Sequence, residues 1–410
     1  MDTQELFDIA QRYSTPAYVL DACEFSTRLR AVRDIFGPTI DMCFSIKANP
    51  QLTRAARACG YKLEVCSPGE LDICKKLNID PKSIVYSGVC KQEEDATRAL
   101  EYGVGVSTAE SPLQFELINS CVHKLIDAGK IPAQPVDVLL RLNAGSQFGM
   151  CLDDLKDIIA KRNNYKYIHI CGIHYFVGTQ RKKLTHQERE LAKLAQLMQD
   201  LKREFDWDCA HLEYGPGLAY PYFVDQDDTD TLLPARTLAP TLQKLAQTTK
   251  LTVEMGRFLA SSSGTYLARI VDIKQGSDAD THYAFIDGGI NHCVYLGQMM
   301  GLKVPHIQNI SRDLGLAPVQ ARACRTWTLA GSLCTTSDIL VRELPLEIGM
   351  GDILAFSHIG AYSITEAMYL FLSRAMPCVV VRHAKGVYEL ARPAIETSQF
   401  NCNSVHFGQE

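Results

Sequence analysis

The sequence predicts an α/β protein in which a (β/α)8 barrel is followed by a C-terminal β-rich domain. The chain has 410 residues, of which 46% are hydrophobic, and this is more than one compact domain usually contains. Up to about residue 260, short apolar runs alternate with amphipathic segments, whereas the later runs are separated by turns. We therefore expect a barrel over 25–260 and a β domain over 261–410, preceded by an N-terminal segment, 1–24.

Eight strand-like runs carry the barrel prediction. In chain order they are DMCFSIKA (41–48), KLEVCS (62–67), SIVYSG (83–88), VGVST (104–108), VDVLLRLN (136–143), HICGIHYFV (169–177), HLEYG (211–215) and KLTVEMG (250–256). The helix-like segments have apolar residues three and four positions apart, and include FSTRLRAVRDIF before the first strand and GELDICKKLN, KQEEDATRALEYG, ESPLQFELINSCV and HQERELAKLAQLMQDLKREF between strands. Eight strands in alternation with helices fit a closed barrel.

The last 150 residues read as strands joined by turns. The runs are GTYLARIVDIKQ, HYAFIDGG, CRTWTLAGSLC, GDILAFSHIGAY and PCVVVRHAKGVYELAR. In the last of these, AKG is typical of a hairpin turn between two strands.

Composition and charge exclude several classes of protein. The net charge of −5 leaves no basic field for nucleic acid or an acidic membrane. No apolar run reaches about 18 residues, and the acidic, amphipathic N-terminus lacks the features of a signal peptide. The 15 cysteines are scattered without a CxxC pair, which favours free thiols in a reducing cytoplasm over a disulfide framework or a zinc site.

The unusual residues stand where the predicted strands end, which is where (β/α)8 barrels place their chemistry. Lys47 ends the first strand in CFSIKANP; on this octet alone, the simpler interpretation is a strand that has reached solvent. A phosphate cradle is predicted from open backbone amides and polar side chains at Gly215, Gly217, Gly256, Arg257 and Thr179. A lysine, a phosphate site and the carboxylate of Glu254 together indicate pyridoxal 5'-phosphate. Lys47 would hold this cofactor covalently, and Glu254 would pair with its pyridine nitrogen.

A resemblance supports this interpretation. YVLD, FSIKANP, EVCSPGEL, YSGVCK, TAES, LRLN, GIHYFVGTQ, EYGPGL, EMGR, FIDGGIN, GSLCTTSD and GDILAFSHIGAY occur in the order found in the fold-type III pyridoxal phosphate decarboxylases, including diaminopimelate and ornithine decarboxylases. The chain resembles this family nearly from end to end. The resemblance implies an alanine racemase-like barrel, a C-terminal β domain that also takes in the N-terminal segment, and a homodimer with two shared active sites.

The resemblance also implies roles for residues outside the barrel and shows departures within it. Tyr362, in GAY, matches a residue that reaches the cofactor phosphate, and Cys334 matches a cysteine that the other subunit donates to protonate Cα. Phe176 stands where the family usually has a ring-stacking histidine, and it can stack but not hydrogen-bond. Among other changes, Thr179 replaces serine, Pro216 a glycine and Met255 a proline.

The substrate is the least determined property. Thr335 is uncharged where relatives carry the glutamate or aspartate that faces a distal amine, although Asp338 could compensate; Asn143 begins a short loop beside the predicted site. We therefore expect a decarboxylase of an amino acid or an amino acid conjugate, as in relatives that act on carrier-bound glutamate or citryl-diaminopropionate in secondary metabolism and siderophore assembly. The alternatives are a diaminopimelate or diamino-acid decarboxylase, an amino acid racemase of the same fold type, and a non-catalytic regulatory relative.

Overall fold

A computed structural model describes residues 1–278, 280–316 and 326–402. The chain divides into two compact units. The barrel unit comprises 26–220 and 230–259, and the β unit comprises 1–25, 221–229 and 260–410. Among the described residues, no helix is both long and apolar enough to cross a bilayer.

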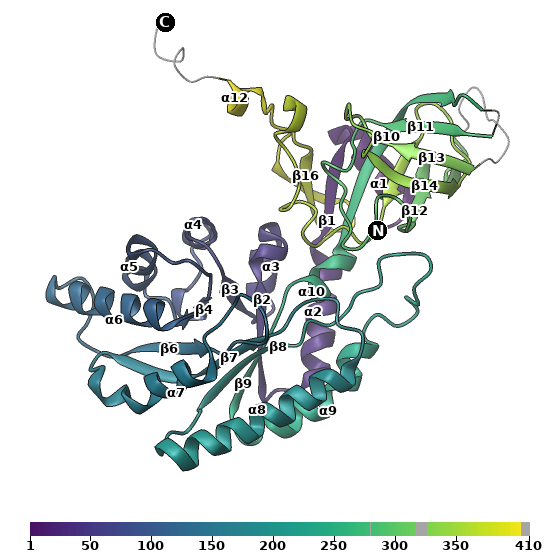
Figure 1. Cartoon of the computed structure of the whole chain (residues 1–410). Coiled ribbons are helices and arrows are strands. Elements are labelled where there is room, and N and C mark those ends of the chain that lie inside the picture. The colour runs from purple at the N-terminus through teal and green to yellow at the C-terminus, as the bar shows by residue number, and fades with distance from the viewer. Residues whose placement is uncertain (279, 317–325, 403–410) are drawn as a thin grey trace, which may run out of the picture. The chain divides into compact units, whose positions relative to one another are not determined.

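The barrel unit contains a closed barrel of eight parallel strands, as the sequence predicted, and every residue of these strands is described (Figure 1). The strands pair in chain order: β2 (Ile40–Ser45), β3 (Lys62–Val65), β4 (Ile84–Tyr86), β5 (Val106–Ala109), β6 (Val136–Arg141), β7 (Ile168–Phe176), β8 (His211–Gly215) and β9 (Lys250–Met255). The barrel closes where β9 pairs with β2, with Cys43 opposite Glu254. This pairing brings the ends of the first and last strands together.

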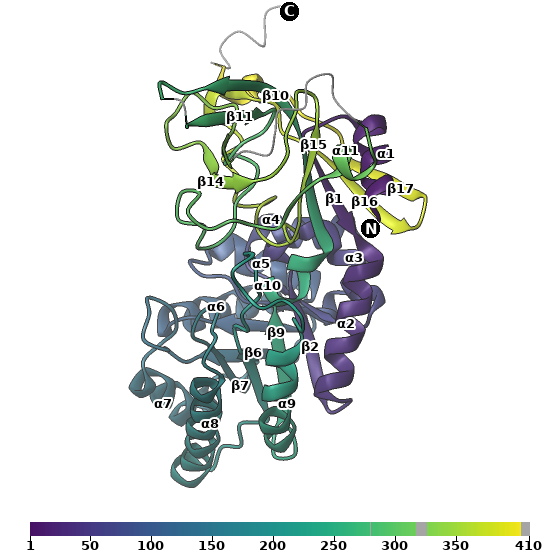
Figure 2. The ribbon, with the colours of Figure 1, turned by 90° about the vertical axis from the view of Figure 1, so that its right-hand side faces the viewer.

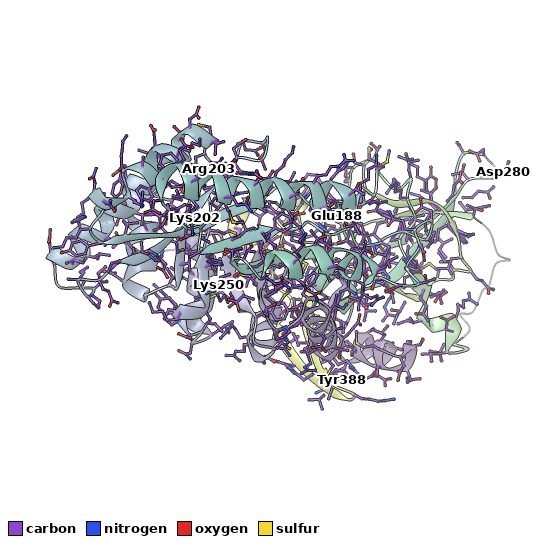
Figure 3. All side chains as sticks on the ribbon, turned by 90° about the horizontal axis from the view of Figure 1, so that it is seen from below. Glu188, Lys202, Arg203, Lys250, Asp280 and Tyr388 are labelled. Carbon is purple, nitrogen blue, oxygen red and sulfur yellow. The ribbon has the colours of Figure 1, made fainter. Side chains whose placement is uncertain are left out.

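Helices follow the strands and surround the barrel. They are α2 (Ala22–Phe36), α3 (Thr53–Ala58), α4 (Pro68–Lys76), α5 (Glu93–Tyr102), α6 (Pro112–Asp127), α7 (Leu152–Ala160), α8 (Leu184–Phe205), α9 (Leu233–Leu245) and α10 (Arg257–Ala260). Helices α4 and α6 begin alike, because Ser67 and Ser111 each accept a hydrogen bond from a backbone amide in the first turn and a proline follows. The longest helix, α8, turns Leu191 and Leu194 inward, while Lys202 and Arg203, labelled in Figure 3, are exposed.

Short 3-10 helices complete the connections. They are η1 (Ile46–Ala48), η2 (Pro50–Leu52), η3 (Pro81–Ser83), η4 (Arg162–Asn164), η5 (Ser261–Ser263) and η6 (Phe371–Ser373). The first two directly follow β2, so the backbone turns sharply after the strand that precedes Lys47.

The β unit is built on a sheet that has nine strands within the described ranges. Its main path is β14 (Ile339–Pro345), β13 (Thr326–Ala330), β11 (His282–Ile286), β10 (Gly264–Gln275), β1 (Ala17–Asp21), β16 (Cys378–Ala384) and β17 (Val387–Arg392). A branch leaves β10 through β15 (Ile353–Phe356) to β12 (Ile307–Asn309). The unit also contains α1 (Thr3–Tyr13), α11 (Ile310–Asp313) and α12 (Ser398–Asn401).

The N-terminal strand is an integral part of this sheet. β1 pairs antiparallel with β10 and parallel with β16, and Figure 2 shows it between them. The apolar face of α1 covers a buried cluster that includes Leu6, Val19 and Val380. The predicted hairpin is present, since Lys385 and Gly386 join β16 to β17 and Gly386 has the positive φ that favours glycine. In the predicted run CRTWTLAGSLC, residues 324–325 lie outside the described residues.

Candidate active site

Lys47 lies just after β2, where Asn49 and Pro50 redirect the chain. The side chain of Asn49 accepts a hydrogen bond from the Gln51 amide, and Pro50 opens η2. The Lys47 side chain is 40% exposed, but its amine is held on one side. Nζ donates to both carboxylate oxygens of Glu64, at 2.9 and 3.1 Å, and to Sγ of Cys66 at 3.3 Å. A strand end that had simply reached solvent would not need these buried partners, so the site interpretation is favoured.

Glu64, on β3, is the buried counter-charge of this lysine. Burial alone would raise the pKa of its carboxyl, but the Lys47 ammonium and hydrogen bonds from Ser45, Lys47 and Ser87 outweigh burial and hold the pKa well below its usual range. The hydroxyl of Ser87 donates to Oε1 at 2.7 Å. Beside it, burial and the charge of Glu64 raise the pKa of the Cys66 thiol to about 12, so this thiol stays protonated.

A second buried carboxylate group lies on the last two strands. Oε1 of Glu254 and Nε2 of His174 form a hydrogen bond at 3.1 Å, and both side chains are buried. Its other oxygen, Oε2, is buried and has no hydrogen-bond partner among the described residues. Such an atom is costly unless a ligand satisfies it. Next to it, burial and the nearby Glu254 carboxylate raise the pKa of the Glu213 carboxyl well above its usual range.

Glycines bring the strand ends close to one another. A Cβ at Gly215 would lie 2.4 Å from Cδ2 of Phe176 and 2.7 Å from Oε1 of Glu254. At Gly217, where φ is +59°, a Cβ would lie 1.8 Å from the backbone oxygen of Gly178. A Cβ at Gly256 would lie 2.9 Å from the Cβ of Ala48, directly after Lys47. The three glycines therefore let these segments approach one another more closely than any residue with a side chain would allow without movement.

The remaining predicted barrel residues gather at the same cradle. Phe176 pairs in register with Gly215 on the neighbouring strand, so its ring lies beside Glu254. The guanidinium of Arg257, at the start of α10, donates from Nε to Oγ1 of Thr179 at 3.3 Å. An arginine, a hydroxyl and open amides are groups that bind phosphate. An aromatic face, a free carboxylate oxygen, a lysine and a phosphate cradle on four neighbouring segments fit pyridoxal phosphate.

Asn143 has a local role in the structure. Its amide Nδ2 donates to the carbonyl oxygens of Ser146 and Phe148, each at 2.7 Å, and its Oδ1 accepts from the Gly145 amide. The side chain therefore closes the short loop after β6. A contact between Asn143 and substrate stays a prediction.

Three predicted residues lie on one loop of the β unit, between β13 and β14. Cys334 is exposed at its tip and Thr335 follows it, half-buried. Asp338 is buried, and its two oxygens accept backbone amides of Ile290 and Leu333 at 2.8 and 2.7 Å. Asp338 thus orders the loop that presents Cys334. A contact between Asp338 and the substrate stays a prediction.

Tyr362 opens a turn that follows β15 in the β unit. Its φ of +70° is rare for an aromatic residue and has a cost of order 1–3 kcal/mol. Its carbonyl oxygen accepts the amides of Thr365 and Glu366. Such a strained backbone persists only where its surroundings determine it, and it often marks a functional position.

Sequence reasoning assigned no role to Glu64, Cys66, Glu213 or His174, although His174 was noted at the end of the sixth predicted strand. A signal for the carboxylates was present, because KLEV, HLEY and TVEM each place a glutamate among apolar residues close to a strand end. In a strand buried on both faces, such a glutamate must find a partner or a ligand. The sequence pattern of the strands does not show which side chain each glutamate contacts.

Comparisons with known proteins identify the family to which the chain is similar. A family model described as pyridoxal-dependent decarboxylase, pyridoxal binding domain, matches residues 23–261. The L-glutamyl-(BtrI acyl-carrier protein) decarboxylase of Niallia circulans is 24% identical over 96% of this chain and 94% of its own length. The diaminopimelate decarboxylase of Methanocaldococcus jannaschii is 25% identical over 95% of this chain and 91% of its own length.

Solved structures show the same fold. The diaminopimelate decarboxylase of M. jannaschii in complex with L-lysine superimposes with a TM-score of 0.82 at 24% identity, covering 95% of this chain and 92% of that one. The lysine/ornithine decarboxylase of Vibrio vulnificus with putrescine gives 0.77 at 18% identity, covering 93% and 98%.

Proposed function

The chain belongs to the pyridoxal-dependent decarboxylase family, and from this premise we propose that it removes the α-carboxylate of an amino acid whose distal end is conjugated or otherwise uncharged. It is a carbon–carbon lyase, and pyridoxal 5'-phosphate is its cofactor. The observation that carries the site assignment is that Lys47 directly follows β2, while Glu254 lies on β9, the strand that pairs with β2. When bound, the cofactor takes up the electron pair released as CO2 leaves.

Each of several barrel residues would bind a different part of the cofactor. Lys47 would attach it, and its amine must lose a proton to do so. Glu254 would accept a hydrogen bond from the pyridine nitrogen at its unpartnered Oε2, and the His174 ring would fix the orientation of that carboxylate. Phe176 would stack on the ring. The phosphate would lie in the cradle of Gly215, Gly217, Gly256, Thr179 and Arg257.

The β unit would supply the remaining groups from a second copy of the chain. Cys334 would return a proton to Cα after decarboxylation, and Tyr362 would reach the phosphate. An exposed cysteine at the tip of an ordered loop supports donation to another subunit. We therefore propose a homodimer with two shared sites that works in the cytoplasm without nucleic acid or a membrane partner.

The uncharged Thr335 supports the substrate proposal. Recognition of a buried ammonium requires a counter-charge, and Asp338 already binds two backbone amides. The match to a decarboxylase of a carrier-bound glutamyl group adds support. Siderophore or other secondary-metabolite assembly is the proposed context. The second candidate is diaminopimelate decarboxylation, favoured by several relatives of that activity.

CO2 release from a panel of substrates tests this proposal. The panel contains diaminopimelate, lysine, ornithine, carrier-bound glutamate and citryl-diaminopropionate, each with the purified, cofactor-loaded enzyme. We expect kcat/KM to be highest for a conjugated substrate. Turnover of diaminopimelate at about 10⁴ M⁻¹s⁻¹ or more, as for an ordinary enzyme, would contradict the pocket argument.

Thr335→Glu is expected to improve the turnover of diamino acids. A charge-assisted hydrogen bond to the distal ammonium is worth roughly 1.5–3 kcal/mol, so kcat/KM should rise about 10- to 150-fold. Steady-state kinetics on diaminopimelate measure the change. The matched control is Thr336→Glu, which adds the same charge at the next, exposed position and should leave the selectivity unchanged. Equal effects of the two variants would mean that net charge, not Thr335, controls the selectivity.

Gly217→Ala is expected to weaken cofactor binding about 10-fold or more. The added Cβ would meet the Gly178 carbonyl at 1.8 Å and force the two loops of the cradle apart. Titration of the cofactor-free protein with pyridoxal phosphate, followed by fluorescence, measures the dissociation constant. Gly103→Ala is the control, because Gly103 has φ +82° but nothing within 4 Å of a Cβ. A loss of affinity shared by both variants would point to backbone strain rather than to the cradle.

A further inference from the structure

Two histidines and an aspartate form a cluster in the β unit that the proposed reaction does not use. His306 precedes β12, His358 follows β15, and Asp228 lies in the segment 221–229. One ligand atom from each lies within 4.8 Å of the other two. The buried His174–Glu213–Glu254 group meets the same distance criterion, but it belongs to the active site described above.

Backbone hydrogen bonds hold the three segments together. The Ser357 amide donates to the His306 carbonyl, which extends the β12–β15 pairing to the two histidines. The Val224 amide donates to the Val304 carbonyl, and Phe223 forms a bridge with Pro305. Asp228 therefore lies on a segment that is tied to the strand bearing His306. The cluster is built on paired strands rather than assembled from free side chains.

The His306 ring and the Asp228 carboxylate lie close together without forming a hydrogen bond. Nε2 of His306 lies 3.6 Å from Oδ2 of Asp228, which is beyond ordinary hydrogen-bond range. This nitrogen is buried and has no hydrogen-bond partner among the described residues. The ring of His358 stands edge-on to that of His306, with centroids 5.1 Å apart. A direct His–Asp ion pair would have brought Nε2 and the carboxylate closer.

A bound cation explains this spacing. Ligands at 2.0–2.2 Å from a tetrahedral Zn²⁺ lie about 3.3–3.6 Å apart, and the His306–Asp228 separation is 3.6 Å. Two imidazoles and a carboxylate suit Zn²⁺, Co²⁺ or Ni²⁺, with a position left for water. The Asp228 and His306 side chains are 43% and 27% exposed, so the cluster lies near the surface of the unit.

We propose that Asp228, His306 and His358 bind one divalent transition-metal ion, which fastens the segment 221–229 to the β12–β15 edge. The site is independent of the decarboxylase assignment. Sequence reasoning considered only cysteine spacing for zinc and could not detect it, because the three residues are 52 to 130 positions apart. His358 has a φ of +63°, a backbone conformation that residues other than glycine rarely adopt.

Cobalt binding to the cofactor-loaded full chain tests the proposal. With exposed thiols blocked, we expect one Co²⁺ per chain, a d–d spectrum without thiolate charge transfer, and a Tm raised by about 5 °C at a 100-fold excess over the dissociation constant. His306→Ala should weaken binding about 100-fold. His358→Asn should do the same with less risk to folding, because asparagine tolerates a positive φ.

The matched control is His383→Ala. His383 forms an exposed pair with Glu389 at 2.8 Å in the same unit, but no third metal-ligating side chain joins this pair among the described residues. Its loss should leave Co²⁺ binding unchanged. The proposal is overturned if the wild type binds no stoichiometric Co²⁺, if the spectrum carries thiolate bands, or if folded His306→Ala and His358→Asn bind as tightly as the wild type.

Discussion

Lys47→Ala is expected to lower kcat/KM by at least about 10³-fold and to abolish covalent attachment of the cofactor. The side chain supplies both the attachment point and a group that can move protons at the substrate, and each contribution is large. Removal of the ammonium also leaves the buried Glu64 without its main partner. Loss of activity in this variant alone would therefore not separate chemistry from folding.

Lys47→Arg separates the two effects. A guanidinium keeps a positive charge beside Glu64 but cannot form the linkage, so this variant should stay folded and inactive. Lys62→Ala is the positional control, since Lys62 opens β3 at the opposite end of the strand from the site and pairs with Asp41 at 2.8 Å. Its activity should be close to normal. Near-full activity in folded Lys47→Arg would remove Lys47 from the reaction.

Mixing two inactive variants is expected to restore activity. If each site combines Lys47 of one chain with Cys334 of the other, a heterodimer of Lys47→Ala and Cys334→Ala contains one intact site and one doubly altered site. Random exchange makes half of the dimers heterodimers, so about a quarter of the wild-type activity should return. If both residues of a site came from one chain, every site would carry a lesion and nothing would return.

The controls for this experiment are each variant by itself and a mixture of two variants that are both altered at Lys47. Lys47→Ala mixed with Lys47→Arg should stay inactive under the same exchange conditions. Native mass spectrometry must show that heterodimers form. No recovery despite heterodimer formation, or a fully active monomer in light scattering, would contradict the shared site.

The barrel could be predicted because its signal is local and repeated. Each strand is a short apolar run, each helix has its own apolar face, and eight repetitions leave few alternatives. The positions of Lys47 and Glu254 followed, since the ends of parallel strands meet at one rim. The glycines of EYGPGL and EMGR were informative for a similar reason: a Cβ at Gly217 or Gly256 meets a neighbouring strand end.

Features that depend on distant pairing could not be predicted in this way. Lys47 donates to Glu64 on β3, and Ser87, which follows β4, donates to the same carboxylate. Only the register of the barrel strands brings these three residues together. Asp338 is a predicted substrate contact because it lies three residues after Thr335 and could supply the missing charge; only the structure shows that its carboxylate also accepts the backbone amides of Ile290 and Leu333. The branched pairing of β15 with β10 and β12 likewise joins segments far apart in the chain.

Lys91 is a second lysine that could be considered as the attachment point of the cofactor, so the assignment of Lys47 can be tested against it. Lys91 is buried, and burial lowers the pKa of its amine to about 8, which favours the neutral form that attachment requires. Its Nζ, however, donates to the carbonyl oxygens of Ser87, Gly88 and Thr108, so its three donors are already engaged. Geometry therefore favours Lys47, whereas the pKa alone would favour Lys91.

Borohydride reduction of the cofactor-loaded enzyme, followed by peptide mass spectrometry, distinguishes the two lysines directly. Reduction makes the linkage between cofactor and lysine permanent, so the labelled peptide identifies the residue that held the cofactor. We predict the pyridoxyl group on Lys47, at close to one per chain, with Lys91 unlabelled. A label on Lys91 or on any other lysine in place of Lys47 would contradict the account of this site.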